Sequence, residues 1–453
     1  MHRKDVKSMS TVYSFPGGVH PIEGKGGKAA TAGEAIIAAP QPSRVAIPLQ
    51  QHIGAPCKPL VSKGDHVKVG QMIGEPVGGM SAAIHASVSG VVVNCQPCIL
   101  ANGTEQPCVI IDNDFKDEWV ELHKVENPDE ITMQQLSDLM RQMGIVGMGG
   151  ATFPAAVKLN VPEGKKVDTL VLNGAECEPY LSADHRLMVE EGEKIITGAK
   201  IIQKALGIDQ VLIGIEDNKP DAVEAMTKFS AKDDSIQVIS LKTKYPQGGE
   251  KQLVYAMTGR VVKMGGLPLD EGVIVCNVGT CHAVCRAVYE GRPVVDRVVT
   301  VGGCVKKPAN YLVRIGAPVE WLIDTSEGFL PETRMLIYGG PMMGMAISRE
   351  DIPITKGCSG ILALDKISAL AKEKPCIRCG RCVEACPMKL MPAQLDRFIR
   401  KDMFDEAEKM NVMNCMECGA CSWSCPARRN LTQSFRVAKR IITNKRKAQK
   451  GGR

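Results

Sequence analysis

The pattern of apolar and polar positions changes character several times along the 453-residue chain. In residues 46–93, short apolar runs are broken by glycine, a pattern that predicts short strands joined by tight turns. In residues 129–290, short apolar strands such as 168–173 alternate with segments of helical spacing such as 131–143 and 190–206. This alternation predicts an α/β domain with a largely parallel sheet.

The rest of the chain adds two further kinds of segment. Residues 296–345 return to a strand-like pattern, and the last 90 residues are helical with cysteine-rich loops. We therefore predict a multidomain α/β protein. The expected parts are an N-terminal segment with a β-domain (1–128), an α/β domain (129–292), a second β-rich module (293–365), a helical cysteine-rich domain (366–430) and a basic C-terminal tail (431–453).

The β-domain pattern resembles the lipoyl/biotinyl-carrier sandwich. Such carriers attach their prosthetic group to a lysine at the hairpin tip between the two halves of the domain. Here the tip, residues 78–83, reads Gly-Gly-Met-Ser-Ala-Ala and has no lysine. We therefore predict a structural β-domain and not a working carrier.

Charge is distributed unevenly along the chain. The formal net charge is +6, but residues 427–453 hold ten Lys and Arg and no acid, so the body of the protein is slightly acidic. A protein that coats nucleic acid is therefore not expected. The N-terminus lacks the apolar core of a signal peptide, and no stretch approaches 18 apolar residues without a charge. These features predict a cytoplasmic, reducing compartment.

Eight of the 18 cysteines form a duplicated motif near the C-terminus. The run C-x₂-C-x₂-C-x₃-C-P begins at Cys376 and recurs 39 residues later. It is the bacterial [4Fe–4S] pattern, in which the fourth cysteine of each run binds the other cluster. Zinc sites pair C-x₂-C units and leave no use for the third and fourth cysteines. The expected ligands are Cys376, Cys379, Cys382 and Cys425 for cluster 1, and Cys386, Cys415, Cys418 and Cys421 for cluster 2.

A glycine-rich loop with Gly147, Gly149 and Gly150 leads into a short helix. Glycines let backbone N–H groups approach a phosphate, and the N-terminus of the following helix adds partial positive charge. Taken alone, such a loop can also be an ordinary turn.

Polar residues follow several of the expected strands. Asn173, Glu176 and Glu178 come directly after one strand, and Glu250 and Asn277 lie in two later loops. Because the carboxyl ends of parallel strands form the ligand crevice of such sheets, these residues could bind a ribose or a nicotinamide amide. A solvated acidic turn is the alternative for the segment from Asn173 to Glu178.

Together these features resemble the flavin- and NADH-binding subunit of respiratory complex I and, more closely, the C subunit of the Rnf electron-transport complex. The resemblance runs from Phe-Pro-Gly-Gly-Val-His-Pro (residues 15–21) through Asn-Gly-Ala-Glu-Cys-Glu-Pro-Tyr (173–180) and Gly-Gly-Pro-Met-Met-Gly (339–344) to the duplicated cysteines. It implies a lipoyl-like β-domain, a complex I flavin-subunit-like α/β domain, a β-grasp (soluble-ligand-binding) module and an α-helical double [4Fe–4S] ferredoxin domain.

The resemblance also implies roles for individual residues. The contacts expected for FMN, bound non-covalently, are Gly147, Gly149, Gly150, Lys158, Asn173 and Asn277. The residues expected to face NAD(H) are Phe153, Glu178 and Glu250, with Glu176 beside them in the crevice. No side chain is expected to act as a catalytic acid or base, because FMN carries the hydride chemistry.

Four positions depart from the complex I family. Met148 stands in place of arginine, Thr152 in place of glycine, and Ala175 in place of aspartate. Gly249 replaces the first glutamate of a Gly-Glu-Glu motif. The duplicated cluster motif also differs from the single-cluster design of the complex I flavin subunit.

The resemblance implies an oxidoreductase subunit of a membrane-bound, ion-translocating ferredoxin:NAD⁺ oxidoreductase. NAD(H) would exchange a hydride with FMN, and single electrons would pass through two [4Fe–4S] clusters. The expected partners are the membrane and iron–sulfur subunits of the Rnf complex, with ferredoxin indirectly, and the expected place is the cytoplasmic face of the membrane, peripherally. The alternatives are a cobalamin reductase of the propanediol microcompartment and a non-catalytic iron–sulfur relay.

The basic tail has a further expected role. Phe435, Ala438, Ile441 and Ile442 share one helical face. This amphipathic pattern predicts docking against an acidic partner or an anionic membrane surface. A solvated tail is the alternative.

Overall fold

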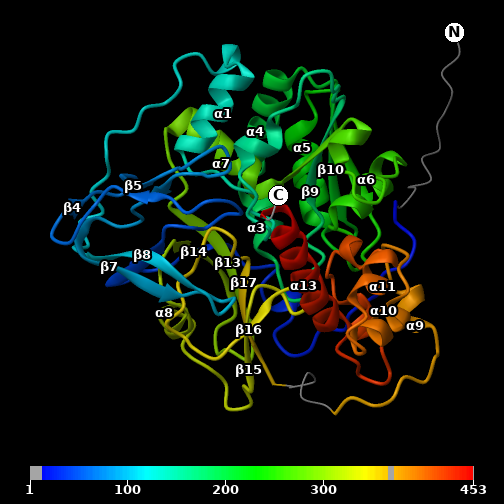
Figure 1. Cartoon of the computed structure of the whole chain (residues 1–453). Helices are drawn as coiled ribbons and strands as arrows, with labels where there is room; N and C mark the ends of the chain where they lie inside the picture. The colour runs from blue at the N-terminus through cyan, green and yellow to red at the C-terminus, as the bar shows by residue number, and fades with distance from the viewer. Residues whose placement is uncertain (1–12, 366–371, 452–453) are drawn as a thin grey trace, which may run out of the picture.

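The computed structural model describes residues 13–365 and 372–451 (Figure 1). Parts of three predicted segments, namely residues 1–12, 366–371 and 452–453, lie outside the described residues. Four sheets form in the described part, and the helices α10, α11 and α13 lie together beside the α/β domain (Figure 1). None of the helices described in these ranges is long and apolar enough to cross a membrane.

The β-domain is a sandwich of two small antiparallel sheets, ordered β2-β8-β7-β4 and β3-β5-β6. Its fully buried core includes Val45, Ile47, Ile73 and Ile111, whose alternation along the strands turns one face of each sheet inward. The strands are β2 (Arg44–Pro48), β3 (Lys58–Pro59), β4 (His66–Val67), β5 (Met72–Glu75), β6 (Ile84–His85), β7 (Gly90–Ile99) and β8 (Glu105–Asn113).

The α/β domain holds a parallel sheet ordered β11-β10-β9-β12. Residues of α1, α4, α5 and α7 join the core on one face, and α6 joins the core on the other. The elements are α1 (Met133–Gln142), α2 (Ala155–Leu159), β9 (Thr169–Gly174), α3 (Ala183–Glu190), α4 (Gly192–Leu206), β10 (Gln210–Glu216), α5 (Pro220–Ser230), β11 (Ile236–Leu241), α6 (Glu250–Thr258), η3 (Pro268–Glu271), β12 (Val273–Asn277) and α7 (Val278–Glu290).

Local sequence signals explain where several of these helices begin and end. A capping box between Thr132 and Gln135 starts α1. Gly207, in the left-handed region at φ 62°, ends α4. The Asn277 side chain accepts from the Gly279 N–H and starts α7, which places the end of β12 against a helix N-terminus.

The third sheet is mixed and has six strands, ordered β1-β14-β13-β17-β15-β16. Its edge strand β1 comes from the N-terminal segment and pairs in parallel with β14. The elements are η1 (Lys28–Ala30), β1 (Ile37–Ala38), β13 (Asp296–Gly303), β14 (Ala309–Arg314), α8 (Val319–Thr325), β15 (Met335–Tyr338), β16 (Met345–Ile347) and β17 (Gly360–Leu364). This sheet and α8 share one core, as a β-grasp arrangement requires.

The C-terminal domain is helical, as the cysteine spacing and the intervening apolar pattern predict. Its elements are α9 (Arg381–Glu384), α10 (Pro392–Ile399), α11 (Phe404–Lys409), η5 (Val412–Asn414), α12 (Ala420–Trp423) and α13 (Leu431–Gly451). The two cysteine runs adopt the same backbone: Arg378 and Glu417 have φ 57° and 59°, and Gly380 and Gly419 have φ 79° and 81°. The duplication in sequence is therefore a duplication in structure.

The tail differs from the expected free docking segment, because α13 packs on its own domain. Phe435, Ala438 and Ile442 are at most 1% exposed and join the core that surrounds the cysteines, while Ile441 stays 39% exposed. Several of its bases also pair within the domain, as Lys439 does with Glu417. The apolar face that the sequence assigns to a partner or a membrane is used inside the chain.

Candidate functional site

The glycine loop, residues 147–152, lies at the carboxyl edge of the parallel sheet. The Gly147 N–H donates to the Phe153 carbonyl at 2.8 Å and closes the base of the loop. The Met148 N–H donates to Thr280 Oγ1 at 3.0 Å, which ties the loop to the first turn of α7. Gly150 has φ +107° and open space where a side chain would be. The loop is thus held at its ends and open at its middle.

A cleft of about 560 Å³ opens beside this loop, a volume within the range of about 300–1,000 Å³ that is typical of small-molecule sites. Three domains supply its walls. The α/β domain contributes 149–152 and Glu178, the β-domain contributes 50–53 and 100–106, and the β-grasp module contributes 338–345. The β-domain also touches the loop directly, because the Ile53 N–H donates to the Thr152 carbonyl at 3.3 Å.

The two predicted carboxylates after β9 both bind backbone N–H groups. Glu176 accepts from the N–H groups of Asp184 at 2.8 Å and His185 at 3.1 Å, at the start of α3. Glu178 accepts from the N–H groups of Met342 at 3.0 Å and Met343 at 2.9 Å. Glu178 thus joins the α/β domain to the β-grasp module while it also lines the cleft.

Burial sets the proton affinity of Glu178. Burial raises its pKa to about 7, although the two N–H donors and the nearby Lys28 oppose the shift. The carboxyl is therefore divided between its two protonation states at neutral pH.

Lys158 and Glu250, which the resemblance places on FMN and on the dinucleotide, form an ion pair with each other. Their Nζ and Oε1 atoms are 2.6 Å apart, and both side chains remain about one-third exposed. Asn173 at the end of β9 donates to the Gly248 carbonyl at 2.9 Å. The loops after β9 and β11 therefore meet at one edge of the sheet, and Asn277 at the end of β12 reaches the same edge by donating to Asp184.

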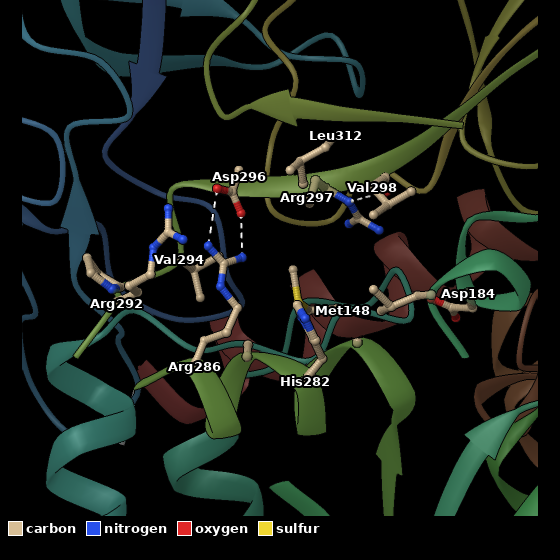
Figure 2. A pocket seen from close by; sticks show the side chains of 14 residues that line it. Met148, Asp184, His282, Arg286, Arg292, Val294, Asp296, Arg297, Val298 and Leu312 are labelled. Atoms are coloured by element: carbon tan, nitrogen blue, oxygen red, sulfur yellow. Dashed lines mark hydrogen bonds and ion pairs between the residues drawn. The ribbon is translucent and has the colours of Figure 1, made fainter. Parts of the chain in front are cut away.

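A small cavity of about 40 Å³, lined by apolar and charged side chains, lies behind the glycine loop (Figure 2). That volume accommodates roughly one or two water molecules. Met148 lines it, as does Asp184, whose carboxylate accepts from the Asn277 amide at 2.7 Å. On its far side Arg286 of α7 pairs with Asp296 of β13 at 2.6 Å (Figure 2). The cavity belongs to the joint between the α/β domain and the β-grasp module.

Two residues near the crevice escaped prediction from the sequence. Lys28 of the N-terminal segment donates to the carbonyls of Glu176 at 2.9 Å and Glu178 at 2.8 Å, and so fixes the acidic loop from outside its own domain. Gln247 is fully buried, and neither polar atom of its side-chain amide has a hydrogen-bond partner among the residues that the structure describes. The only sequence signal for Gln247 is its place in a polar, glycine-containing loop after an expected strand.

The residues at the crevice fit FMN. A buried amide without a partner costs about 1–3 kcal/mol, and a polar ligand would satisfy it. The glycine loop leaves backbone N–H groups and open space at Gly150, and Lys158 supplies a cation beside it in sequence. These groups would hold the phosphate, while Gln247 and Asn173 offer hydrogen bonds to the rest of the flavin.

The duplicated cysteine runs suit two [4Fe–4S] clusters, and the structure brings four of the eight thiols together. Cys386, Cys415, Cys418 and Cys421 together line one small cavity in the C-terminal domain. Among residues 13–365 and 372–451, no three Cys, His, Asp or Glu side chains converge on one point as ligands of a single ion would. Four thiols spread around a cavity suit a cube of four irons.

The second set of thiols lies nearer the surface. Burial raises the pKa of the Cys382 thiol, and the charges of Cys425 and Cys376 add to the shift. Cys376 and Cys379 are exposed. Cluster 1 would therefore lie at the surface, whereas the cavity of cluster 2 lies inside the protein.

Backbone N–H groups already point at two of the cluster 2 thiols. The Leu390 N–H donates to Cys386 Sγ and the Glu417 N–H donates to Cys415 Sγ, each at 3.4 Å. Hydrogen bonds to cluster sulfurs are one of the means by which proteins set reduction potentials. The described residues thus include the donors that a bound cluster needs.

The cluster 2 region rests directly on the crevice loop. The Tyr245 hydroxyl donates to the Cys418 carbonyl at 2.6 Å, and Gln252 Nε2 donates to the Pro387 carbonyl at 3.3 Å. Val19 and Cys177 pack in the same contact. Crevice and clusters are therefore joined through one continuous interface.

Comparison with known proteins decides the family. The chain is 49% identical to the C subunit of the proton-translocating ferredoxin:NAD(+) oxidoreductase complex of Clostridium ljungdahlii, over 94% of this chain and 93% of that protein. It is 45% identical to the C subunit of the Na(+)-translocating ferredoxin:NAD(+) oxidoreductase complex of Acetobacterium woodii, over 96% and 98%. The chain belongs to the RnfC family. Another member, the C subunit of the ion-translocating oxidoreductase complex of Rhodobacter capsulatus, is 43% identical over 94% and 83%.

Four family models divide this RnfC chain in agreement with its fold. The RnfC barrel sandwich hybrid domain matches residues 13–116, the Nuo51 FMN-binding domain 140–286, the SLBB domain 298–346 and the 4Fe-4S dicluster domain 369–426. They confirm the predicted fold class and the predicted cofactors, FMN and [4Fe–4S] clusters. The three relatives are subunits of ion-translocating complexes and not cobalamin reductases.

A solved structure supports the RnfC fold independently. The NAD⁺-reducing [NiFe]-hydrogenase in its H₂-reduced state aligns with a TM-score of 0.50 at 16% identity, over 68% of this chain and 64% of that one. At that identity the likeness concerns the fold alone.

Proposed function

We propose that this chain exchanges electrons with NAD(H) at the crevice and carries them through two [4Fe–4S] clusters, as part of a membrane-associated, ion-translocating ferredoxin:NAD⁺ oxidoreductase complex. When bound, FMN exchanges a hydride with NAD(H) and passes its two electrons on singly. Each of the two clusters accepts one electron, so the pair can take both electrons of one hydride. The residues of the chain bind, orient and space these groups.

Each predicted residue has a place in this proposal. The backbone of Gly149 and Gly150 and the charge of Lys158 hold the flavin phosphate, with Asn173 and Asn277 beside them, and Gly147 closes the base of the loop. Phe153, Glu178 and Glu250 face the dinucleotide. Glu176 acts through the α3 N-terminus that it caps. The ligands of cluster 1 are Cys376, Cys379, Cys382 and Cys425, and those of cluster 2 are Cys386, Cys415, Cys418 and Cys421.

One observation supports the order in which we propose that electrons pass through the two clusters. The cavity of cluster 2 rests on the crevice loop through Tyr245 and Gln252, whereas Cys376 and Cys379 are exposed. Electrons from the crevice therefore reach cluster 2 first and leave through cluster 1.

The exposed loop also suggests the kind of partner. All residues from 374 to 379 are exposed, including Lys374 and Arg378, and Ile377 is 67% exposed. A cationic rim around an apolar centre suits an acidic iron–sulfur partner. We assign this role to a neighbouring iron–sulfur subunit of the complex, through which ferredoxin exchanges electrons indirectly, and we place the chain peripherally on the cytoplasmic face of the membrane.

Ligand variants test this order. In anaerobically purified protein, Cys379→Ser removes cluster 1, and we expect NADH still to reduce cluster 2. Cys418→Ser removes cluster 2, and we expect NADH to reduce the flavin but no longer cluster 1, which dithionite still reduces. The measurement is electron paramagnetic resonance of each cluster with parallel FMN and iron analysis, and Cys95→Ser, at an exposed thiol outside both motifs, is the matched control.

The reverse pattern would contradict the proposed order: cluster 1 reduced by NADH in Cys418→Ser, and cluster 2 silent in Cys379→Ser. If the wild-type protein, reconstituted with FMN, shows no NADH-dependent reduction of either cluster, the electron-relay alternative replaces the enzyme.

A further inference from the structure

Gly249 lies where the crevice meets the cluster 2 region, at the N-cap of α6. Its backbone, at φ −60° and ψ 126°, is one that any amino acid adopts. The backbone conformation at position 249 therefore does not require a glycine. Crowding by side chains is the feature that sets this position apart: a Cβ here would lie 2.7 Å from Met416 Cε, 2.7 Å from Gln252 Oε1 and 3.1 Å from the Pro246 carbonyl oxygen. The first two atoms are the ends of flexible side chains, so a larger residue would displace Met416 and Gln252 more than the backbone.

Met416 connects this glycine to cluster 2. It lies between the ligands Cys415 and Cys418 and lines the same cavity as their thiols. One end of the Met416 side chain thus touches the crevice loop, while the residue itself belongs to the loop that wraps the cluster. Methionine is flexible and polarisable, which suits a contact that must fill an irregular gap.

The difference from the complex I family at position 249 has a physical reason. That family has a glutamate where this chain has Gly249, and here the space of that side chain is occupied by Met416. The dicluster domain comes close to the crevice loop at Gly249, next to its contacts with Tyr245 and Gln252.

We propose that Gly249 is a positioning residue: its missing side chain lets Met416 seat the cluster 2 loop against the crevice and so sets the distance over which electrons cross. This inference rests on the proposed function. Because the rate of electron tunnelling falls exponentially with distance, a small outward shift of the cluster 2 loop slows this step strongly. The hydrogen bond from the Tyr245 hydroxyl to the Cys418 carbonyl does not involve the side chains that crowd position 249 and keeps the two domains docked, so the shift stays local.

The test uses the full chain loaded with FMN and both clusters. Gly249→Glu restores the glutamate, and Gly249→Leu fills the same space without charge. In both we expect flavin reduction by NADH to stay within about twofold of wild type and cluster 2 reduction, followed by stopped flow, to slow at least tenfold. FMN and iron content stay at wild-type levels. Gly79→Glu, at an exposed glycine with nothing within 4 Å, is the matched control.

A double-mutant cycle isolates the contact. In Met416→Ala the space opposite position 249 is empty, so Gly249→Leu should cost far less there, both in cluster 2 reduction rate and in the melting temperature of the loaded protein. Non-additive effects of the two substitutions on both the cluster 2 reduction rate and the melting temperature would support the positioning role. The melting temperature is included because it does not depend on turnover.

Three outcomes overturn the inference: cluster 2 reduction at the wild-type rate in Gly249→Leu, absence of coupling with Met416→Ala, or loss of FMN from the Gly249 variants, which would assign Gly249 to the flavin site itself. Failure of the proposed function is distinguishable, because in that case the wild-type protein already shows no NADH-dependent cluster reduction.

Discussion

The side chain of Glu178 has two roles, one in joining two domains and one in lining the cleft. The carboxylate accepts the N–H groups of Met342 and Met343 and so holds the β-grasp turn against the α/β domain. It also lines the cleft in which we place the dinucleotide. Burial outweighs these hydrogen bonds and raises the pKa to about 7. The strength of this joint should therefore depend on pH near neutrality.

The sign of that dependence follows from linkage. A carboxyl whose pKa is higher in the folded than in the unfolded chain stabilises the fold at low pH, and that contribution is lost as pH rises from about 4.5 through about 7. We expect Glu178→Gln, which cannot ionise, to flatten the fall in melting temperature over this range, at a cost of about 1 kcal/mol for one weakened hydrogen bond.

Thermal unfolding followed across this pH range measures the effect. Glu163→Gln, at an exposed carboxyl, should keep the wild-type slope. An unchanged slope in Glu178→Gln would show that another group titrates, the first candidate being Asp184, whose pKa burial and Glu176 also raise to about 7.

At the scale of elements, the strongly periodic helices and the duplicated cysteine loops follow from sequence because each is encoded locally. The capping box at Thr132 and the glycine at 207 fix helix ends within a few residues. The contacts of Lys28 and Gln247 could not be predicted, because they depend on segments that meet only in the folded chain. Periodicity likewise shows that α13 has an apolar face but not which surface covers it.

The helix α13 is part of the cluster domain, and its loss should therefore affect the clusters. Phe435 is 1% exposed in the core that contains Cys382 and Cys421, and Thr432 Oγ1 lies 3.8 Å from Cys421 Sγ. We expect Phe435→Ala to cost about 3–5 kcal/mol and to lower the iron content. Melting temperature and iron per chain measure both effects.

Val437→Ala, on the outer side of the same helix at 45% exposure, is the control and should change neither quantity appreciably. Wild-type iron content in Phe435→Ala would show that the cluster loops hold their ligands without the helix.

At the scale of the whole molecule, the contact between the crevice and the cluster 2 region is internal, whereas the contact with a partner near Cys376 and Cys379 would be external. The cavity proposed for cluster 2 rests on the crevice within a shared interface, so we expect the step between them to depend on packing and to be insensitive to salt. The exposed basic loop proposed to bind cluster 1 would exchange electrons with a partner through an encounter between charged surfaces. Screening should therefore distinguish the two steps, since the Debye length is about 10 Å at 0.1 M salt.

Arg378→Glu tests the outer contact, and the internal duplication shows that glutamate adopts this backbone conformation. The equivalent residue of the second cysteine run, 39 positions later, is Glu417, which has nearly the same positive φ. Reversing the charge beside the exposed Cys376 and Cys379 should slow electron exchange with an acidic iron–sulfur partner about tenfold at low salt, because steering by opposite charge is lost. The difference should shrink as salt rises, while reduction of both clusters by NADH stays salt-independent. Arg440→Glu, at an exposed base on α13, is the matched control, and equal slowing by both variants would place the partner elsewhere on the domain.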